Sequence, residues 1–273
     1  MIKRPTALLR LAPAAAATAL ALFGASAAVA GVQLEFQDRD ISRVISISGS
    51  CSRCELSGRR LTGANFIGAD FSQAMLVGAD LRGASIVGSN FSGTDLTRAD
   101  LRGAELVGSQ FSQARLVQAR MDGVEALGAD FAAADLSRAN MSGAELHGAR
   151  LSRVRAERTN FTGAELNGAD LRNGDFGEAD FQGASLNGAR LAGGRFVRAD
   201  FNEADLNQAD LRGADLSEAR GLTQGQINRA CSDSTTRLPA GLTARTCGGG
   251  RGGTPRPVAP PRPFFTIVIA DAD

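Results

Sequence analysis

Histidine, lysine, tryptophan and tyrosine are nearly or completely missing from this chain of 273 residues. The sequence has no Trp and no Tyr, a single lysine (Lys3) and a single histidine (His147). One histidine excludes multi-histidine metal sites and leaves no further histidine to support a catalytic triad. Paired carboxylates recur along the whole chain, whereas a hydrolase cleft would single out two of them. We therefore expect no catalytic residue, no metal site and no cofactor, and a protein that is not an enzyme.

A large net charge of either sign is also missing, and long apolar runs are rare. The formal charge of +1 gives no general attraction to nucleic acid or membranes, so no nucleic-acid partner is expected. One apolar stretch, residues 11–29, follows three basic residues and ends in Ala-Val-Ala at Ala30. This layout predicts a signal peptide over residues 1–30 and an exported protein, periplasmic or secreted, without a transmembrane anchor after cleavage. The alternative is an uncleaved membrane anchor, for which about 19 Ala-diluted residues are short.

What the chain does contain is a Leu, Phe, Met or Ile at every fifth residue from Leu56 to Leu216. Of these 33 central positions, which we call centres, only Ala126 and Ala156 are small, and Val instead of Ala stands two residues before each. At that position 23 of the 33 residues are Ala. A period of five fits neither a helix nor a flat strand, and fixed self-similarity marks a stacked repeat. A small centre with a larger partner keeps the core volume constant, so we interpret both as compensated repeats.

The repeating stretches ADFSQ, ADLRG, AELVG, ANMSG and ADLSE follow the pattern A-(D/N)-(L/F)-x-x. On these residues the chain resembles the pentapeptide-repeat family over residues 54–218. The resemblance implies an all-β fold, a right-handed quadrilateral parallel β-helix of about eight coils with the small and large residues pointing inward. At ~4.8 Å per rung this solenoid is a rod roughly 40 Å long.

The same resemblance supplies an alternative function. Some members of the family resemble DNA in size and charge and bind or protect a topoisomerase, DNA gyrase. That function requires a cytoplasmic location and a strongly acidic rod. Residues 55–220 hold 23 acidic and 18 basic residues, a net of −5, and a predicted export signal precedes them.

A 20-residue pattern supports four sides per coil. The second residue after the centre is Gly on two sides for seven coils in a row, from Gly63 to Gly183 and from Gly68 to Gly188. On the other two sides it is mostly Arg, Gln, Glu or Ala, as at Arg98. We interpret this as two corners that need positive φ and two that do not. Phenylalanine centres also recur at 20-residue spacing, which predicts two ring stacks worth ~0.5–1.5 kcal/mol per pair: Phe71, Phe91, Phe111 and Phe131; Phe161, Phe181 and Phe201.

The segments around the repeats have different compositions. Residues 31–53 are predicted to form an N-terminal cap with short strands, since uncovered sheet edges invite pairing between chains. Residues 219–247 are predicted to form a C-terminal cap, with a short helix within residues 221–230 that begins at a Thr223 cap. Residues 248–263 are rich in Gly, Pro and Arg and read as a disordered linker. The tail, residues 264–273, is β-prone and either pairs with an edge or a partner or is frayed.

Four cysteines form two local pairs, one at each end of the predicted rod. Export would place them in an oxidising compartment, where disulfides persist. Cys231 and Cys247 enclose a loop of about 15 residues, a closure worth ~3 kcal/mol. Cys51 and Cys54 are either a second disulfide or two buried thiols, because both fall at inward positions. A redox centre at this C-x-x-C is a further alternative, although no thioredoxin-like pattern accompanies it, and a zinc site would need two further ligands.

The predicted outer surface carries three patterned columns. One column alternates in sign: Asp95, Arg115, Asp135, Arg155, Asp175, Arg195 and Asp215. A second stacks like charges: Glu105, Glu125, Glu145 and Glu165. A third is aliphatic: Ile67, Val87, Val107 and Leu127. The glutamates are either solvated surface or a docking site for a basic partner or cation, and the aliphatic column is either an interface or packing across a corner.

These columns predict a function by surface binding. The expected protein is an exported, non-enzymatic scaffold that binds a protein or envelope component through its rod, with a homodimer as a further expectation. His147 is predicted to point outward into solvent, between Leu127 and Asn167.

Overall fold

The computed structural model describes residues 49–247, all within one compact unit of the chain. Four predictions therefore lie wholly or mostly outside the described residues. They are the signal peptide (1–30), the strands of the N-terminal cap (31–48), the linker (248–263) and the β-prone tail (264–273).

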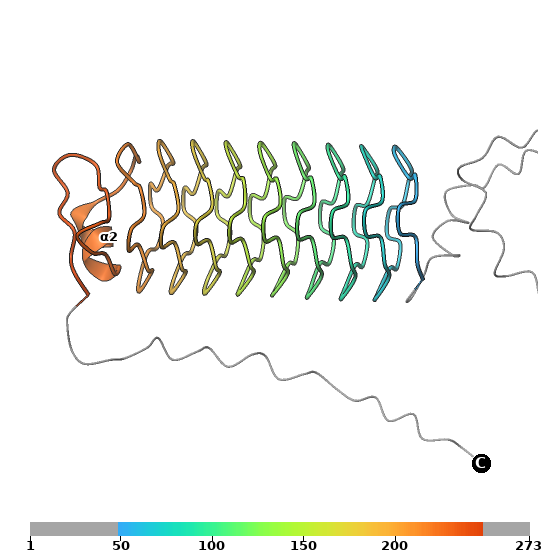
Figure 1. Ribbon diagram of the computed structural model, residues 1–273, viewed down its shortest axis with the longest axis horizontal. Coiled ribbons are helices and arrows are strands. Elements are labelled where there is room, and N and C mark those ends of the chain that lie inside the picture. The colour runs from blue at the N-terminus through green and yellow to red at the C-terminus, as the bar shows by residue number, and fades with distance from the viewer. Residues whose placement is uncertain (1–48, 248–273) are drawn as a thin grey trace, which may run out of the picture. The chain divides into compact units, whose positions relative to one another are not determined.

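The backbone of residues 50–220 winds in coils of 20 residues, with one pentapeptide on each of four sides. Parallel single-residue bridges join each residue before a centre to its equivalent one coil later, from Ser50↔Asp70 to Asp200↔Arg220. The series runs from residue 50 to residue 220, about eight and a half coils, and confirms the right-handed quadrilateral β-helix. No longer strand forms within residues 49–247, because the chain turns a corner every five residues. Figure 1 shows the coils stacked side by side as a straight rod.

Every corner is a β-turn closed by the peptide N–H of the inward small residue, as where Ala64 donates to the Leu61 carbonyl at 3.1 Å. The second residue after the centre has φ between 57° and 68° at all corners from Arg53 to Gly213. The prediction that only two corners need positive φ is therefore wrong. A non-glycine residue costs about 1–2 kcal/mol in this conformation. Long side chains offset part of that cost, as where Arg98 Nε donates to Gln118 Oε1 at 3.0 Å.

The inward side chains of all four sides form one continuous core. All 31 large centres are buried, and full burial of such a side chain is worth about 1.5–3 kcal/mol. Ala126 and Ala156 are also fully buried, and Val124 and Val154 are buried beside them, as compensated repeats require. Arg59 is the exception in the first coil, since it occupies a small inward position and is exposed.

Phenylalanine rings stack between successive coils inside the rod. Both predicted stacks form, with ring centroids 4.8–5.2 Å apart in one and 5.0–5.1 Å apart in the other. A third stack, which the sequence analysis missed, joins Phe176 and Phe196 at 5.0 Å. It lies against the second predicted stack with the planes tilted by 56–59°.

The C-terminal end of the rod is closed by α2, Gln224–Arg229, as predicted (Figure 1). Thr223 caps it: its side chain accepts a hydrogen bond from the Gln226 N–H, and the Gln226 side chain accepts one from the Thr223 N–H. Gln226 Nε2 also donates to the carbonyls of Phe201 and Ala204, at 3.0 and 2.9 Å. These carbonyls belong to the last turns of the solenoid. Gln226 therefore also provides hydrogen bonds to backbone carbonyls that no further coil covers. Within residues 49–247 no helix is long or apolar enough to span a membrane.

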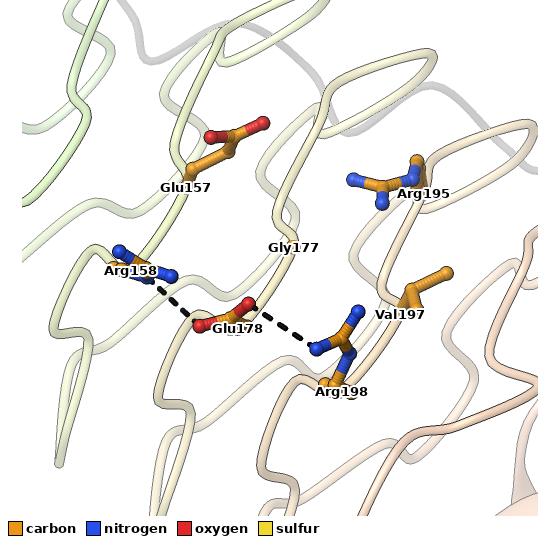
Figure 2. Close-up of a pocket in the computed structure, with 7 residues that line it drawn as sticks. All are labelled: Glu157, Arg158, Gly177, Glu178, Arg195, Val197 and Arg198. Carbon is orange, nitrogen blue, oxygen red and sulfur yellow. Dashed lines mark hydrogen bonds and ion pairs between the residues drawn. The ribbon is translucent and has the colours of Figure 1, made fainter.

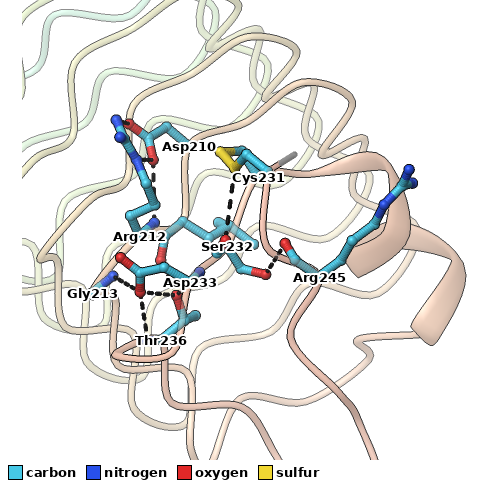
Figure 3. The surroundings of a disulfide bond; sticks show 10 residues. Asp210, Arg212, Gly213, Cys231, Ser232, Asp233, Thr236 and Arg245 are labelled. Carbon is cyan, nitrogen blue, oxygen red and sulfur yellow. Dashed lines mark hydrogen bonds and ion pairs between the residues drawn. A yellow bond between two sulfur atoms is a disulfide. The ribbon is translucent and has the colours of Figure 1, made fainter. Parts of the chain in front are cut away.

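The chain after α2 adds a last partial rung, pinned by a disulfide. Cys231 bridges to Asp210 in the coil below and is bonded to Cys247 (Figure 3). Next to it, Asp233 accepts hydrogen bonds from Thr235 and from the peptide N–H of Gly213. These bonds, that of Thr235 first, lower the pKa of the Asp233 carboxyl to about 2. The carboxylate therefore fastens the closing loop to the last coil.

At the other end of the rod, Cys51 is bonded to Cys54. Cys51 occupies a centre and is buried, as its register predicts. Of the two alternatives left open by the sequence, the structure therefore shows the disulfide, and residues 49–247 hold no free cysteine.

The disulfides give a first testable expectation. Purified protein, denatured without reductant, should show no thiol that reacts with a chromogenic disulfide reagent, and about four per chain after full reduction, since the sequence has four cysteines. Two reactive thiols before reduction would remove one bridge, and mass mapping of alkylated peptides would identify it.

Candidate functional site

The glutamate and aliphatic columns lie together on one side of the rod, the side whose centres run from Phe66 to Leu206. The column before these centres carries the stacked glutamates, joined rung to rung by the bridges Glu105↔Glu125, Glu125↔Glu145 and Glu145↔Glu165. The column after the centres carries Ile67, Val87, Val107 and Leu127. The two columns flank a buried centre on every coil, so both point outward and run parallel along the rod.

The aliphatic column faces solvent. Ile67 is 41 % and Leu127 38 % exposed, while Val87 and Val107 are half-buried. Side chains that packed across a corner would be covered, so the exposure of the two end residues favours the interface interpretation. A row of exposed apolar side chains marks an interaction surface more often than scattered ones do.

Among the described residues, the glutamate column has polar partners only at its ends. At its ends, Glu105 accepts a hydrogen bond from Ser85 Oγ at 3.0 Å, and Glu165 lies 2.7 Å from Nε2 of His147. Glu125 and Glu145, between them, are exposed and have no ion-pair partner among residues 49–247. Like charges one rung apart repel by about 1 kcal/mol even in water. The two central carboxylates therefore carry a repulsion that a cationic group would relieve.

His147 continues the aliphatic column by one rung. Its side chain is 36 % exposed, so the predicted outward position holds, but it is not free in solvent. Besides the contact with Glu165, its Nδ1 lies 3.4 Å from the amide nitrogen of Asn167. The histidine thus ends the aliphatic row and fixes one end of the glutamate row.

At both corners that border this side, the second turn residue is glycine over most of the rod. On one corner glycine occupies seven coils from Gly63 to Gly183, and on the other seven coils from Gly68 to Gly188. The second turn residue of each bordering corner therefore carries no side chain, whereas the first turn residue does: it belongs to the aliphatic column on one corner and includes Arg82 and Arg102 on the other. We call this side, with its glutamate and aliphatic columns, the glycine-edged face.

The opposite side of the rod, whose centres run from Leu56 to Leu216, is neutralised within itself. Its outward column alternates in sign as predicted, and each arginine pairs with the aspartate one coil earlier, as where Arg195 contacts Asp175 at 2.7 Å. The column continues into the cap, because Arg237 contacts Asp215 at 3.4 Å. We call this side the ladder face.

A shallow depression lies on the ladder face where Gly177 replaces a side chain (Figure 2). Its lining residues are Glu157, Arg158, Gly177, Glu178, Arg195, Val197 and Arg198. Glu178 contacts Arg158 at 2.8 Å and Arg198 at 3.6 Å, and the hydrogen bond from Arg158 is the first cause of its lowered pKa. Glu178 thus already pairs with two arginines, and Arg195 pairs with Asp175, in contrast to Glu125 and Glu145.

Four aspartate–arginine forks stabilise the remaining two sides. In each, an arginine one residue after the centre folds back onto the aspartate one residue before it: Asp80 and Arg82, Asp100 and Arg102, Asp170 and Arg172, Asp210 and Arg212. In the first fork both contacts are short, 2.8 and 2.7 Å, and the hydrogen bond from Arg82 lowers the pKa of Asp80. The sequence analysis missed these forks, although the spacing D-x-R in the repeat could have indicated them.

The glycine-edged face is thus the part of the described surface with exposed apolar groups beside unpaired charge of one sign. Within residues 49–247 no group of three or more His, Cys, Asp or Glu side chains is arranged to hold a metal ion. The face offers a flat strip with one acidic and one aliphatic row, which suits contact with another macromolecule. Met75, 47 % exposed on the ladder face, is an isolated apolar residue that the sequence analysis did not single out.

The family model for pentapeptide repeats matches the chain in eight copies. The matched segments span residues 50–86, 84–123, 114–153, 127–163, 139–177 and 179–218. Together these segments cover more than half of the chain. A comparison with curated proteins finds no match.

Solved structures similar to this chain include two pentapeptide repeat proteins and one fluoroquinolone resistance protein. HetL, a pentapeptide repeat protein involved in heterocyst differentiation regulation from the cyanobacterium Nostoc sp. strain PCC 7120, is 29 % identical; the match covers 69 % of this chain and 91 % of HetL, with a TM-score of 0.32. QnrB1, a plasmid-mediated fluoroquinolone resistance protein, is 21 % identical, with 66 % and 90 % covered and a TM-score of 0.35. Rfr23, a pentapeptide repeat protein from the cyanobacterium Cyanothece 51142, is 31 % identical, with 38 % and 63 % covered and a TM-score of 0.25.

Proposed function

Because the chain belongs to the pentapeptide-repeat family, we propose that it is an exported, non-enzymatic scaffold that binds a protein or envelope partner through its rod surface. A solenoid presents a long, regular surface built from identical rungs, and such surfaces are used for binding. The signal-peptide layout of residues 1–30 supports export. The oxidising compartment that export implies agrees with the two disulfides.

The observation that carries the proposal is the contrast between the two opposite faces. On the ladder face each arginine of the outward column has an aspartate partner one coil earlier. On the glycine-edged face Glu125 and Glu145 have no cationic partner within the described part of the chain, and they lie next to an exposed aliphatic row. Unpaired charge beside exposed apolar surface costs stability in the free protein, and a bound partner that covers both would recover that cost.

The experiment compares one substitution on each face. Val107→Asp places a charge in the aliphatic column, and Val117→Asp places the same charge at the equivalent position of the ladder face; both valines are half-buried and follow a buried centre. We expect both variants to melt within a few degrees of the wild type, because both side chains point outward and surface substitutions usually change stability by only about 0.5 kcal/mol. Tagged full chain is used to capture proteins from the envelope fraction, and the bound proteins are quantified by mass spectrometry.

Loss of a captured protein with Val107→Asp, but not with Val117→Asp, is the expected result. Sedimentation of the same variants shows whether the lost partner is a second copy of the chain. Equal capture by all three proteins would contradict binding through the glycine-edged face. Fractionation of the cells tests export separately: an uncleaved cytoplasmic protein would contradict it and would favour the topoisomerase-binding alternative.

A further inference from the structure

The bare corners of the glycine-edged face are not required by the fold. Twelve non-glycine residues adopt the same positive φ at the other two corners, as Arg98 does at 59°, and Glu203 and Gln208 do so where the two glycine columns end. A Cβ added to the bordering glycines, such as Gly103 and Gly108, would meet no atom within 4 Å. The intrinsic preference of this φ for glycine applies to all four corners alike, so it does not explain why only these two are bare over seven coils. Glycine at these positions removes one row of side chains from each edge of the face and so favours a wide contact.

The chemistry of the face specifies what such a contact must contain. Over the first four rungs, from Ile67 to Leu127, the face offers aliphatic groups. From Glu105 to Glu165 it offers carboxylates, of which the central two have no ion-pair partner among residues 49–247. A complementary segment therefore has apolar side chains along one line and Arg or Lys beside them, with the basic residues concentrated toward the His147 end.

The spacing of the rungs selects the secondary structure of that segment. Successive rungs are ~4.8 Å apart. On an α-helix, side chains on the same face recur every three or four residues, about 5.3 Å on average, so three rungs accumulate a mismatch of only about 1.5 Å. On an extended strand, side chains on the same face recur every ~6.7 Å, which accumulates more than about 5 Å over the same distance. A helix parallel to the rod axis keeps register with the face, and a strand does not.

We propose that the glycine-edged face binds an amphipathic, basic α-helix of a partner protein, laid along the rod axis. The six rungs from Ile67 to Glu165 span about 24 Å, which corresponds to a helix of roughly 16 residues. The helix covers both columns at once, because it is about 10 Å wide and the columns are two residues apart. This proposal rests on the scaffold function proposed above and adds the class of partner.

The probe is a fluorescein-labelled helical peptide of about 16 residues. It carries leucines at i, i+3, i+4 and i+7 on one face and arginines beside them, and its control is a scrambled peptide of the same composition. Binding to the full chain is measured by fluorescence anisotropy at several salt concentrations. We expect saturable one-to-one binding, and at least about tenfold weaker binding of the scrambled peptide.

Matched variants locate the contact. Gly108→Arg raises a side chain at the edge of the glycine-edged face, whereas Gly78→Arg does so at a corner of the ladder face; an added Cβ meets no atom within 4 Å at either site. We expect Gly108→Arg and Val107→Asp to weaken peptide binding at least about tenfold, and Gly78→Arg and Val117→Asp to leave it within about twofold. Glu125→Gln combined with Glu145→Gln should weaken binding and flatten its salt dependence. Glu157→Gln, an exposed glutamate on the ladder face, should change neither.

Three results would overturn the proposal. The peptide could fail to bind the wild-type chain, the substitutions on the two faces could weaken peptide binding equally, or the scrambled peptide could bind as tightly as the designed peptide. A dimer that Val107→Asp disperses would also overturn it, because the occupant would then be a second copy. If envelope capture depends on Val107 but the peptide neither binds nor competes, the scaffold function stands and the helical partner does not. Peptide binding with the expected face dependence, but no capture from the envelope, would support the surface chemistry and contradict the scaffold function.

Discussion

Leu136→Asp is expected to destabilise the rod by more than about 3 kcal/mol. Leu136 is a centre in the middle of the solenoid, with none of its surface exposed. In the coils on either side the same inward column holds Leu116 and Ala156, both fully buried as well. A carboxylate at this position would have no cationic partner, because the charged side chains of the neighbouring columns point outward, and the buried Thr159 hydroxyl already donates to the Leu136 carbonyl at 2.7 Å. The free-energy cost of burying this unpaired carboxylate can be relieved in two ways: the surrounding coils unfold, or the carboxylate is protonated.

Urea denaturation followed by far-ultraviolet circular dichroism at neutral pH measures this effect. Val117→Asp is the control, since it introduces the same charge beside a buried centre but at an outward position. A midpoint that moves equally little in both variants would mean that Leu136 does not point inward, and the four-sided register would be wrong. Because solenoid coils contact only their neighbours, loss of a central coil is expected to lower the cooperativity of the transition as well.

The fold was predictable because a single local rule specifies it. The five-residue ladder of centres defines which side chains point inward, and the 20-residue recurrence of glycine and phenylalanine defines how many sides a coil has. The conformation of the corners was not predictable from glycine content. Arg98 and Gln118 adopt positive φ because the closed coil requires it, and the pair then gains a side-chain hydrogen bond. Tertiary closure here overrides a local preference of about 1–2 kcal/mol.

The candidate site was predictable as a set of columns but not as a surface. Spacing alone placed Glu105 to Glu165 in one stack and Ile67 to Leu127 in another, and the structure puts both on one face. Spacing could not show which charges are paired, since that depends on rotamers. Arg195 reaches back to Asp175 at 2.7 Å, whereas Glu125 and Glu145 find no cation within the described residues. The contrast between the two faces, on which the proposed function depends, therefore required coordinates.

One core feature that sequence reasoning missed leads to the second large expected effect. Val124 beside Ala126 showed that a small centre takes a larger partner, and the converse holds at Phe176, a large centre whose partner two residues earlier is Gly174. A Cβ added to Gly174 would lie 2.5 Å from Cε2 of Phe176 and 3.2 Å from Cγ1 of Val154. Gly194 stands in the same relation to the next ring of the stack, with its added Cβ 2.7 Å from Cε2 of that ring.

Gly174→Ala is therefore expected to destabilise the rod by about 2–3 kcal/mol, although it adds only one methyl group. The Phe176 ring cannot retreat, because it stacks on Phe196 at 5.0 Å and lies against Phe181 at 5.8 Å. The backbone itself would accept alanine, since the φ of Gly174 is outside the left-handed region. The cost is thus a clash with one ring, and it should disappear when that ring is removed.

A double-mutant cycle measured by urea denaturation tests this directly. In a Phe176→Leu background the coil regains the Ala–Leu pairing found at Ala134 and Leu136, so Gly174→Ala should be neutral or stabilise by up to about 1 kcal/mol. The sign of the substitution would then reverse with the identity of a single neighbour. A similar cost of Gly174→Ala in both backgrounds would contradict the clash and assign the effect to the backbone. A neutral effect in the wild type would show that the ring stack shifts to admit the methyl group, and that the core is less tightly fixed than the ring spacing indicates.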